Sequence, residues 1–372
     1  MCLRILHVVG IMSRGGTETL LMNLYRRIDR EKIQFDFAVH STQPGDYDQE
    51  ILSLGGKIYY FPKYTGFNHF LYLKKWSLFF QTHPEHPIIH GHIRSTAAFY
   101  LTYAKKYHRK TIAHSHSTSS RGNKSEKIVK RILQYPIRYI ADYFFACSLQ
   151  SGIWLFGKKI CKSNNFQVLH NTIDSKKFIF QENIRKQKRR ELDIENRFVI
   201  GHVGNFDNEK NHPFLIDIMA DLCQKDTACC LVLAGGGNLT LQKKIQYLAR
   251  QKGVSSHIKF LGSRSDISDL LNAFDIFLLP SLHEGLGIAA IEAQANGLRC
   301  ILSDTVPQEV QITDLAEFIS LKQNASVWAE KILSYKNNRA RRNMQKTVIS
   351  AGYDISSTIH WMTDFYLDFM EV

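Results

Sequence analysis

Short apolar runs recur along the chain, and each is followed by a polar or glycine-rich turn and then by a segment with helical spacing of its apolar residues. The runs are mostly continuous rather than alternating, which is typical of strands buried on both faces of a parallel sheet. They occupy residues 3–9, 34–40, 57–61, 88–90, 143–147, 198–203, 229–234, 258–261, 276–279 and 300–303. Alternating strands and helices predict an α/β fold in which helices cover both faces of parallel sheets.

The length of 372 residues exceeds what one ordinary core holds, so we expect two domains. Residues 181–190 are polar, lack an apolar pattern and are interpreted as the linker between them. The predicted domains are therefore residues 1–180 and 191–351. No apolar run reaches the length of about 18 residues that a membrane-spanning helix needs. The apolar start leads into a glycine-rich loop, which is typical of a first strand rather than of a signal peptide.

The stretch 274–297 contains, in order, a strand, a polar loop and a helix rich in small residues that is expected to begin near Ile288. Glu284 falls on the loop and Glu292 on the helix, with seven residues between them. The N-terminus of such a helix lies at the carboxyl edge of the sheet and favours phosphate, whereas carboxylates accept hydrogen bonds from sugar hydroxyls. By itself this pair is common, and two solvated surface acids would have the same spacing.

In its details the stretch resembles the E-x7-E motif of retaining glycosyltransferases with the GT-B fold, in particular glycosyltransferase family 4. Many bacterial enzymes of capsular and exopolysaccharide synthesis carry a run similar to residues 281–286 (SLHEGL) and 291–295 (IEAQA). The resemblance extends over nearly the whole chain. It implies two Rossmann-like, doubly wound parallel-sheet domains that face a central cleft. It also implies that the final helix, 352–372, packs back on the first domain through a stripe that includes Met362 and Tyr366.

The resemblance further implies a nucleotide-sugar donor, and we expect UDP as its nucleotide. Glu284 would act catalytically by holding hydroxyls of the donor sugar, and Glu292 would accept hydrogen bonds from the ribose. The start of the helix and one lysine would stabilise the leaving diphosphate. The residues implied there are Gly285, Leu286, Gly287 and Lys210. No DxD motif occupies a matching position, so we expect neither a metal ion nor another cofactor, and we expect transfer with retention of the anomeric configuration.

One departure from the family pattern, GRxxxxKN, follows the strand at 198–203. Lys210 stands at the lysine position, but Asn205 stands at the arginine position. Asparagine can donate hydrogen bonds, yet it lacks the charge and the bidentate fork of arginine. Either Arg14 or Arg264 substitutes for the missing cation, or donor affinity is reduced. Arg264 is itself a candidate donor-binding residue, because its loop resembles the family's loop under the nucleotide base.

Glycine-rich turns and strand-end histidines supply the remaining candidates. Gly15 and Gly16 resemble the family's first loop, which implies that they face the donor diphosphate. His116 matches the family's strand-end histidine and is implied to act catalytically near the donor sugar, whereas His114 matches it less well. The two histidines could instead be hydrogen-bonded structural residues or zinc ligands, but no third ligand is near in the sequence. Residues 235–237 form a glycine run without the pattern of a P-loop or a dinucleotide fingerprint, which disfavours ATP and NAD.

Basic residues are concentrated in the first half of the chain. Residues 1–180 contain 26 Lys and Arg against 11 Asp and Glu, a net charge of +15, whereas the net charge of residues 181–372 is −1. Such asymmetry favours an anionic partner, either a membrane surface or nucleic acid, although a solvated face would also explain it. The segment 63–80 interleaves aromatic residues with lysines, and we expect most of its rings in the core and its lysines at an anionic membrane.

The leading hypothesis is therefore a glycosyltransferase of cell-surface polysaccharide synthesis that extends a lipid-linked or oligosaccharide acceptor. We expect a cytoplasmic enzyme, bound peripherally to the inner face of the cell membrane through its basic half and binding no nucleic acid. The cysteines are odd in number and form no CxxC pair, which favours thiols in a reducing compartment. Two alternatives stay open: a sugar-nucleotide epimerase with the GT-B fold, and a basic protein that binds nucleic acid or membrane.

Overall fold

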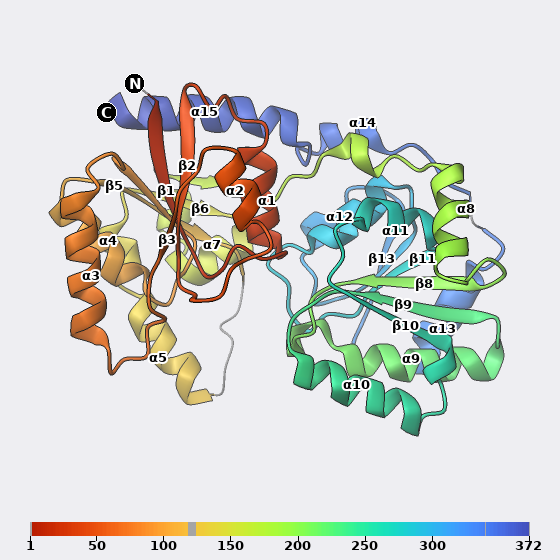
Figure 1. The fold of residues 1–372 in the computed structure, drawn as a ribbon. Coiled ribbons are helices and arrows are strands. Elements are labelled where there is room, and N and C mark those ends of the chain that lie inside the picture. The colour runs from red at the N-terminus through yellow and green to blue at the C-terminus, as the bar shows by residue number, and fades with distance from the viewer. Residues whose placement is uncertain (1, 118–123, 339, 372) are drawn as a thin grey trace. The chain divides into compact units, whose positions relative to one another are not determined.

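The computed structural model describes residues 2–117, 124–338 and 340–371. The chain divides into two compact units, one formed by Met1–Thr172 with Ile355–Val372 and the other by Ile173–Asp354. Each unit is built around its own parallel sheet (Figure 1). Within the described ranges, no helix combines the length and the apolar character needed to cross a membrane.

A seven-stranded sheet forms the centre of the first unit, in the order β3-β2-β1-β4-β5-β6-β7. Its strands are β1 (Leu3–Val9), β2 (Ile33–Val39), β3 (Ile58–Tyr60), β4 (Ile88–Gly91), β5 (Lys110–Ser115), β6 (Tyr143–Ala146) and β7 (Phe166–Val168). The chain proceeds outward from β1 to β3 and then crosses to β4 on the other side of β1. Open sheets of this kind bind ligands at the carboxyl ends of the strands beside such a reversal.

Two apolar layers cover this sheet. The helices of the unit are α1 (Gly16–Tyr25), α2 (Asp48–Ser53), α3 (His69–Thr82), α4 (Ala97–Lys106), α5 (Lys124–Gln134), α6 (Ile137–Ile140), α7 (Leu149–Phe156) and α15 (Ile355–Glu371). One layer contains residues of α1, α2 and α15, and the other contains residues of α3, α4, α6 and α7. Helix α15 comes from the far end of the chain, and its Met362 and Tyr366 are buried in the first layer.

The second unit has a six-stranded sheet in the order β10-β9-β8-β11-β12-β13. Its strands are β8 (Phe198–Val203), β9 (Cys229–Ala234), β10 (Ile258–Gly262), β11 (Ile276–Leu279), β12 (Cys300–Ser303) and β13 (Ala316–Ile319). Its helices are α8 (Glu182–Glu191), α9 (His212–Lys225), α10 (Leu239–Gln251), α11 (Ile267–Ala273), α12 (Ile288–Ala295), α13 (Ala325–Ser334) and α14 (Gln345–Ser350). The strand order reverses between β8 and β11, as it does between β1 and β4 in the first unit.

The predicted fold class, two Rossmann-like parallel-sheet units, is confirmed. Strands β1, β8, β9, β11 and β12 have the predicted bounds. Strands β7 and β13 were not predicted, because both are edge strands of three or four residues that lack a continuous buried run.

The interpretation of residues 181–190 as a linker is wrong. This segment is helix α8, which belongs to the second unit and packs against α11. The buried side chains of α8 are Lys188 and Arg189, which bond to Asp266 and Asp275. Because charged residues form its buried face, the helix lacks the apolar periodicity by which helices are recognised in a sequence.

The prediction for the aromatic segment 63–80 is confirmed for most of its rings. Helix α3 buries Tyr72, Trp76, Phe79 and Phe80 in the second apolar layer. Phe67 and Phe70 are exceptions, because they are among the most exposed large apolar side chains of the described chain.

Candidate functional site

The acidic and basic candidates of the second unit lie at the carboxyl ends of β8 and β11, the neighbouring strands at which the strand order reverses. Lys210 follows β8 in a short 3-10 helix, Asn208–Lys210, whose start is capped by the carboxylate of Asp207. Asp207 accepts hydrogen bonds from the backbone N–H groups of Glu209 and Lys210 at 3.0 and 3.1 Å. This cap fixes the backbone from which the lysine side chain projects.

Lys210 and Glu284, which are 74 residues apart in the sequence, form an ion pair. The Lys210 Nζ donates to Glu284 Oε1 at 2.5 Å, and the Ser281 hydroxyl donates to the same oxygen at 2.7 Å. Both charged side chains are largely buried, with 20% and 9% of their surfaces exposed. The structure thus brings together the cation and one of the two acids that the sequence singled out.

The loop that carries Glu284 is fastened to its neighbours through its backbone. The N–H of Leu282 donates to the carbonyl of Glu209 at 2.7 Å, which ties the loop to the segment after β8. The carbonyl of Ser281 accepts from the hydroxyls of Ser303 and Thr305 at 2.6 and 2.5 Å, which ties it to the segment after β12. Glu284 is therefore held on a braced loop rather than on a free surface turn.

Gly285, Leu286 and Gly287 connect this loop to helix α12, which begins at Ile288 as predicted. Leu286 is buried, so its side chain anchors the loop rather than presenting a contact to a ligand. Gly287 has φ of +96°, a conformation that residues with a Cβ rarely adopt. The backbone N–H groups of these three residues and of the first turn of α12 are the groups that could bind an anion there.

Glu292 lies one turn inside α12 and is half-buried. No described residue donates a hydrogen bond to its carboxylate. Removal of water from around the carboxylate raises the pKa of Glu292 to about 8. An acid in this state gains most from a ligand that brings hydroxyl donors to it.

Asn205, at the arginine position of the family pattern, is exposed and follows Gly204 after β8. The glycine run after β9 packs closely against it, because a Cβ on Gly235 would lie 2.0 Å from the carbonyl oxygen of Gly204. This close approach of two backbones explains why a glycine is needed at 235. It does not bring a second cation to Asn205.

Arg264, after β10, is already bound to two acids of its own region. It forms a bidentate pair with Asp266, at 2.8 and 2.6 Å, and a contact of 3.3 Å with Glu191. These hydrogen bonds raise the pKa of Arg264 and lower that of Asp266. The guanidinium is thus bound to two acids within the second unit, and a diphosphate would have to replace both of them, whereas Lys210 forms its ion pair with one acid, Glu284.

In the first unit, Gly15 and Gly16 lie at the start of helix α1, where Gly15 is the residue that precedes the first helical turn. A Cβ on Gly15 would lie 2.5 Å from Glu18 Oε2. The carboxylate of Glu18 therefore folds back over the glycine, at the helix end that the sequence assigned to the donor diphosphate. A phosphate that binds there has to displace this carboxylate.

His116 belongs to a cluster of five histidines at the carboxyl ends of β1, β4 and β5, hereafter the histidine cluster. Its members are His7, His90, His92, His114 and His116. One hydrogen-bonded chain runs from His7 Nδ1 to His92 Nε2 at 3.0 Å and from His92 Nδ1 to His116 Nε2 at 2.8 Å. A second runs from the hydroxyl of Tyr366 to His90 Nδ1 at 2.7 Å and from His90 Nε2 to His114 Nδ1 at 3.2 Å.

Burial keeps these imidazoles neutral, because water that would stabilise the charged form is excluded. It lowers the pKa of His92 to about 3, and it lowers the pKa values of the other four histidines well below the usual value. No third ligand is near His114 and His116 in the sequence, but the fold supplies one, because His92 lies beside both of them. The sequence carried a usable signal: the patterns His-Gly-His at 90–92 and His-Ser-His at 114–116 each place two histidines on one face of a strand end.

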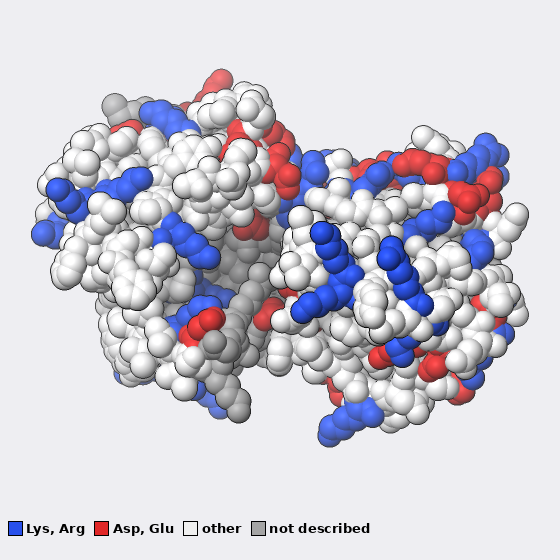
Figure 2. All heavy atoms as spheres, turned by 60° about the horizontal axis from the view of Figure 1, so that its bottom comes forward, with Lys and Arg blue, Asp and Glu red and all other residues white. Residues whose placement is uncertain are grey.

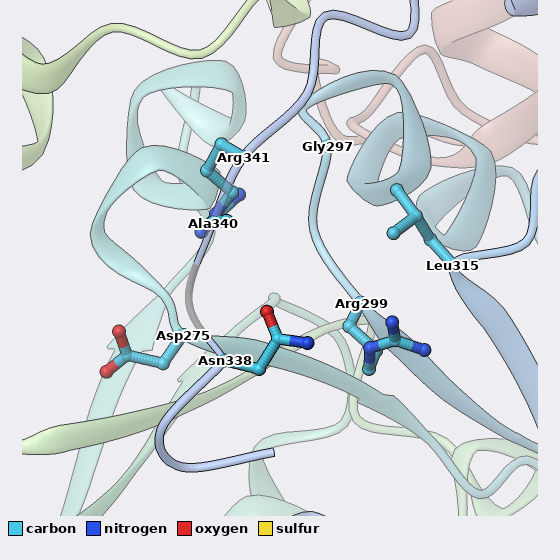
Figure 3. A pocket seen from close by; sticks show the side chains of 7 residues that line it. All are labelled: Asp275, Gly297, Arg299, Leu315, Asn338, Ala340 and Arg341. Atoms are coloured by element: carbon cyan, nitrogen blue, oxygen red, sulfur yellow. The ribbon is translucent and has the colours of Figure 1, made fainter.

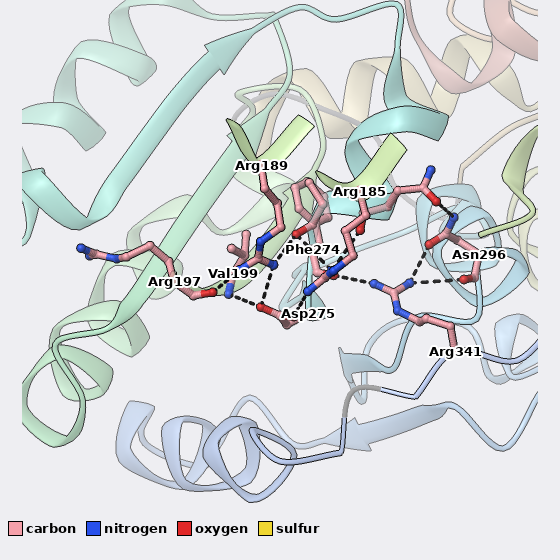
Figure 4. A network of polar contacts seen from close by, with 10 residues as sticks. Arg185, Arg189, Arg197, Val199, Phe274, Asp275, Asn296 and Arg341 are labelled. Carbon is pink, nitrogen blue, oxygen red and sulfur yellow. Dashed lines mark hydrogen bonds and ion pairs between the residues drawn. The ribbon is translucent and has the colours of Figure 1, made fainter. Parts of the chain in front are cut away.

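At the opposite edge of the second sheet, before β11 and β12, a small pocket and a dense polar network occur (Figures 3 and 4). The residues that line the pocket are Asp275, Gly297, Arg299, Leu315, Asn338, Ala340 and Arg341. Asp275 accepts from Arg185 at 2.6 Å, from Arg189 at 3.2 Å and from the N–H of Val199 at 2.7 Å. Arg341 donates to Asn296 Oδ1 at 2.6 Å. The charged groups of this network already have partners, so its role is to hold α8 and the segment around Arg341 to the sheet.

Comparisons with known proteins agree with this arrangement. The model of the family Glycosyl transferases group 1 matches residues 183–353, and the model of Glycosyltransferase Family 4 matches residues 14–177. EpsF of Bacillus subtilis, which is named as a glycosyltransferase, is 33% identical over 370 residues, which cover 98% of this chain and 96% of that protein. CapH of Staphylococcus aureus, named as a capsular polysaccharide biosynthesis glycosyltransferase, is 24% identical over 379 residues, covering 98% and 99%.

Among solved structures, Anabaena HepE in complex with UDP-glucose superposes with a TM-score of 0.80 at 18% sequence identity, over 98% of this chain and 99% of HepE. A likeness at this identity establishes the GT-B fold and no more. The full-length similarity to EpsF, together with the two family matches that cover the two units, establishes the enzyme class. The chain belongs to the group 1 and family 4 glycosyltransferases.

Proposed function

We propose that this enzyme is a retaining glycosyltransferase that moves a sugar from a UDP-linked donor to a growing, lipid-linked saccharide in cell-surface polysaccharide synthesis. The observation that carries the proposal is the ion pair between Lys210 and Glu284 at the reversal point of the second sheet. Similarity to CapH supports polysaccharide synthesis, and the UDP-glucose complex of HepE supports the choice of nucleotide.

In the proposed reaction, the donor diphosphate takes the place of the Glu284 carboxylate on Lys210. The lysine then compensates the negative charge that grows on the leaving diphosphate, together with the backbone N–H groups of Gly285, Leu286 and Gly287. Glu284, released from the lysine but still held by Ser281, accepts hydrogen bonds from hydroxyls of the donor sugar. Charge compensation by these groups leaves no step that needs a metal ion.

Two further contacts complete the donor site in this proposal. Glu292 accepts hydrogen bonds from the ribose hydroxyls, which give its poorly solvated carboxylate the donors it lacks. For the first unit, the family resemblance supports a role of His116 at the donor sugar and of the N–H groups of Gly15 and Gly16 at the diphosphate. The acceptor hydroxyl attacks from the side of the leaving group, so the anomeric configuration is retained.

The lipid-linked acceptor is proposed because the first unit exposes apolar side chains among basic ones. On helix α5, Ile128, Val129 and Ile132 are exposed beside Arg131. Near the start of α3, Phe67 and Phe70 expose 103% and 85% of their surfaces. In the view of Figure 2, lysine and arginine side chains of the first unit lie scattered over largely uncharged surface, with a few acidic side chains near them. Apolar side chains that enter the bilayer interface and cations that meet anionic head groups are the two requirements of peripheral binding.

The donor site is tested by separating nucleotide binding from sugar transfer. A panel of UDP-sugars is screened for thermal stabilisation of the enzyme, and the best donor is then used in a transfer assay with a lipid-linked acceptor. The Glu284→Gln variant should lose about 100- to 1,000-fold in turnover while binding UDP at least as tightly, because Lys210 is freed. Glu330→Gln, an exposed acid on α13, is the matched control and should behave as the wild type.

A Glu284→Gln enzyme with normal turnover, or stabilisation by no UDP-sugar at all, would overturn the proposed donor site. The anomeric configuration of the product, measured by NMR, tests retention separately, and an inverted product would contradict it.

The membrane surface is tested with vesicles that do or do not contain anionic phospholipid. The enzyme should sediment with anionic vesicles at low salt and be released as salt is raised. The double variant Ile128→Ser/Ile132→Ser should bind about tenfold or more weakly, since two apolar side chains no longer enter the interface. A matched double variant on α10, Leu239→Ser/Tyr247→Ser, removes equally exposed apolar side chains and should bind normally. Equal binding by the two double variants would show that α5 is not the docking surface.

A further inference from the structure

The histidine cluster contains more imidazoles than the proposed transfer reaction uses. Only His116 has a part in that reaction, yet four more histidines surround it at the carboxyl ends of β1, β4 and β5. Two sets of three within the cluster place one ligand atom from each residue within 4.8 Å of the others: His7, His90 and His92, and His92, His114 and His116. Both sets consist only of histidines, and they share His92.

We propose that His92, His114 and His116 form a binding site for a transition-metal cation of the Zn²⁺ type. Imidazole nitrogen is a preferred ligand of Zn²⁺ and its neighbours Co²⁺, Ni²⁺ and Cu²⁺, whereas Mg²⁺ and Ca²⁺ prefer oxygen. Three protein ligands leave a fourth position for water or an added ligand. The proposal depends on the first unit alone and stands whether or not the proposed donor chemistry is correct.

The spacing of the ligand atoms suits a metal ion after a small adjustment. A tetrahedral ion with metal–nitrogen distances of about 2.0–2.1 Å needs its ligand atoms about 3.4 Å apart. His92 Nδ1 and His116 Nε2 are 2.8 Å apart and share one proton in a hydrogen bond. A cation that replaces this proton pushes the two rings slightly apart, while His114 approaches.

Unsatisfied nitrogen atoms are a second, independent observation. His114 Nε2 and His116 Nδ1 are buried and have no hydrogen-bond partner among the described residues. A buried polar atom without a partner costs free energy, so a group that restores its coordination stabilises the cluster. Metal coordination through His114 Nε2 would satisfy one of these two atoms, whereas His116 would bind the metal through Nε2, the atom that now faces His92 Nδ1.

The choice between the two sets follows from access. His7, His90 and His92 are all buried, whereas His116 is half-buried and lies at the end of β5, where the chain leaves the sheet. An ion from solvent therefore reaches the set that contains His116. A described cation that acts on His116 is Arg94, whose guanidinium lies over the ring of Trp154 at 4.9 Å and donates to the carbonyl of Ser117 at 3.2 Å. Its charge opposes a divalent ion, so only metals with strong affinity for imidazole are expected to bind.

The test is a titration of tag-free, EDTA-treated full-length enzyme with Co²⁺, followed by its visible d–d absorption, and then displacement by Zn²⁺. One tetrahedral Co²⁺ per chain is expected, and excess Zn²⁺ should remove the absorption. The variants His92→Gln and His116→Gln should bind Co²⁺ more than about 100-fold more weakly, beyond the 10- to 100-fold loss typical of residues that only support a ligand. His108→Asn is the matched control, because His108 is exposed and its φ of +56° suits asparagine.

Each outcome decides the proposal. Failure of the wild type to bind Co²⁺ with tetrahedral absorption overturns it without reference to any variant. Retention of binding by His116→Gln together with loss in His92→Gln would place the metal in the other set and overturn the assignment. Circular dichroism of both variants verifies folding, and the half-buried position of His116 makes its variant the safer of the two.

Discussion

Charged side chains lie at both edges of the second sheet, but the hydrogen-bond and ion-pair partners of these side chains differ between the two edges. At the amino edge, Asp275 has Arg185, Arg189 and the N–H of Val199 as partners (Figure 4). At the carboxyl edge, Glu284 accepts from Lys210 and from the hydroxyl of Ser281, whereas no described residue donates to the carboxylate of Glu292. Because Glu292 has no protein donor there, the carboxyl edge, hereafter the unsatisfied edge, is the one that we assign to the substrate.

The pKa values of the acids also differ between the two edges. Burial by itself raises the pKa of Asp275, but the charges of Arg185 and Arg189 outweigh burial and hold it below the usual value. The pKa of Glu292 is raised to about 8 because burial acts there without a compensating cation. The charge of Asp275 is therefore stabilised by its cationic partners despite burial, whereas the charge of Glu292 is opposed by burial without such partners.

The largest expected effect comes from breaking the satisfied edge. Asp275→Asn keeps the shape of the side chain but leaves Arg185 and Arg189 as buried cations without a counter-charge. We expect a loss of about 3–5 kcal/mol in the free energy of unfolding, measured by urea denaturation followed by circular dichroism. Asp193→Asn is the control, because Asp193 is 99% exposed and its φ of +53° suits asparagine. If Asp275→Asn lowered the free energy of unfolding by less than about 1 kcal/mol, the proposed structural role of the amino edge would be wrong.

The next effect comes from the unsatisfied edge, and it should appear in activity rather than in stability. Lys210→Met removes the cation that we assign to the leaving diphosphate. Turnover of the UDP-sugar should fall about 100- to 1,000-fold, equivalent to about 2.7–4 kcal/mol in the transition state. The free energy of unfolding should fall by less than it does in Asp275→Asn, because the loop keeps its backbone bonds and Glu284 keeps the hydroxyl of Ser281 as a donor. Destabilisation as large as that of Asp275→Asn would make the pair structural.

At the carboxyl edge, the sequence predicted the secondary-structure elements but not the contact between Lys210 and Glu284. The strand–loop–helix unit with Glu284 and Glu292 was placed correctly, because a continuous apolar run and a helix start signal are local features. The pairing of Lys210 with Glu284 was not predicted, because 74 residues separate them and nothing local encodes the contact. Helix α8 was missed for the opposite reason, since its buried side chains are charged and conceal its periodicity.

In the first unit, the histidine cluster was likewise predicted only in part. His116 was singled out, but His7 and His92 were not, although they form the chain of hydrogen bonds that ends at His116. His7 is a lone histidine in its strand and His92 is paired in sequence only with His90, so the order of the strands is what brings both of them to His116. Local patterns therefore predicted the elements and individual candidates, whereas the partners of each candidate depended on topology.

A smaller effect is expected from adding charge at the unsatisfied edge. Asn205 is exposed, so Asn205→Arg introduces a guanidinium without displacing a buried group. If the diphosphate binds there, one new charge-assisted contact should tighten UDP binding about tenfold, or by about 1.4 kcal/mol, in a calorimetric titration. Asn208→Arg, at an exposed position of the 3-10 helix, adds the same charge nearby and should change binding less. Equal gains in both variants would indicate general attraction rather than the missing clamp.

The last expected effect is of a different kind, a pH dependence that belongs to Glu292. In the folded enzyme its pKa is about 8, whereas an unfolded glutamate titrates near its ordinary value of about 4.3. Between these two values the folded state binds the extra proton, so the contribution of Glu292 to stability falls as pH rises through this window and is constant above it. Glu292→Gln has no such proton, and its melting temperature should therefore rise relative to that of the wild type from pH 5 to pH 8.

Differential scanning fluorimetry from pH 5 to pH 8 measures the difference in melting temperature between Glu292→Gln and the wild type. A difference in melting temperature that does not change with pH would show that the carboxylate of Glu292 ionises normally. Binding of UDP gives a second test of the protonation state of Glu292. Ribose hydroxyls that donate to Glu292 favour its ionised form, so UDP binding near pH 7 should release a proton from the wild type and none from the variant. Titration calorimetry in buffers of different ionisation enthalpy detects this proton, and it distinguishes an acid completed by its substrate from one that is merely buried.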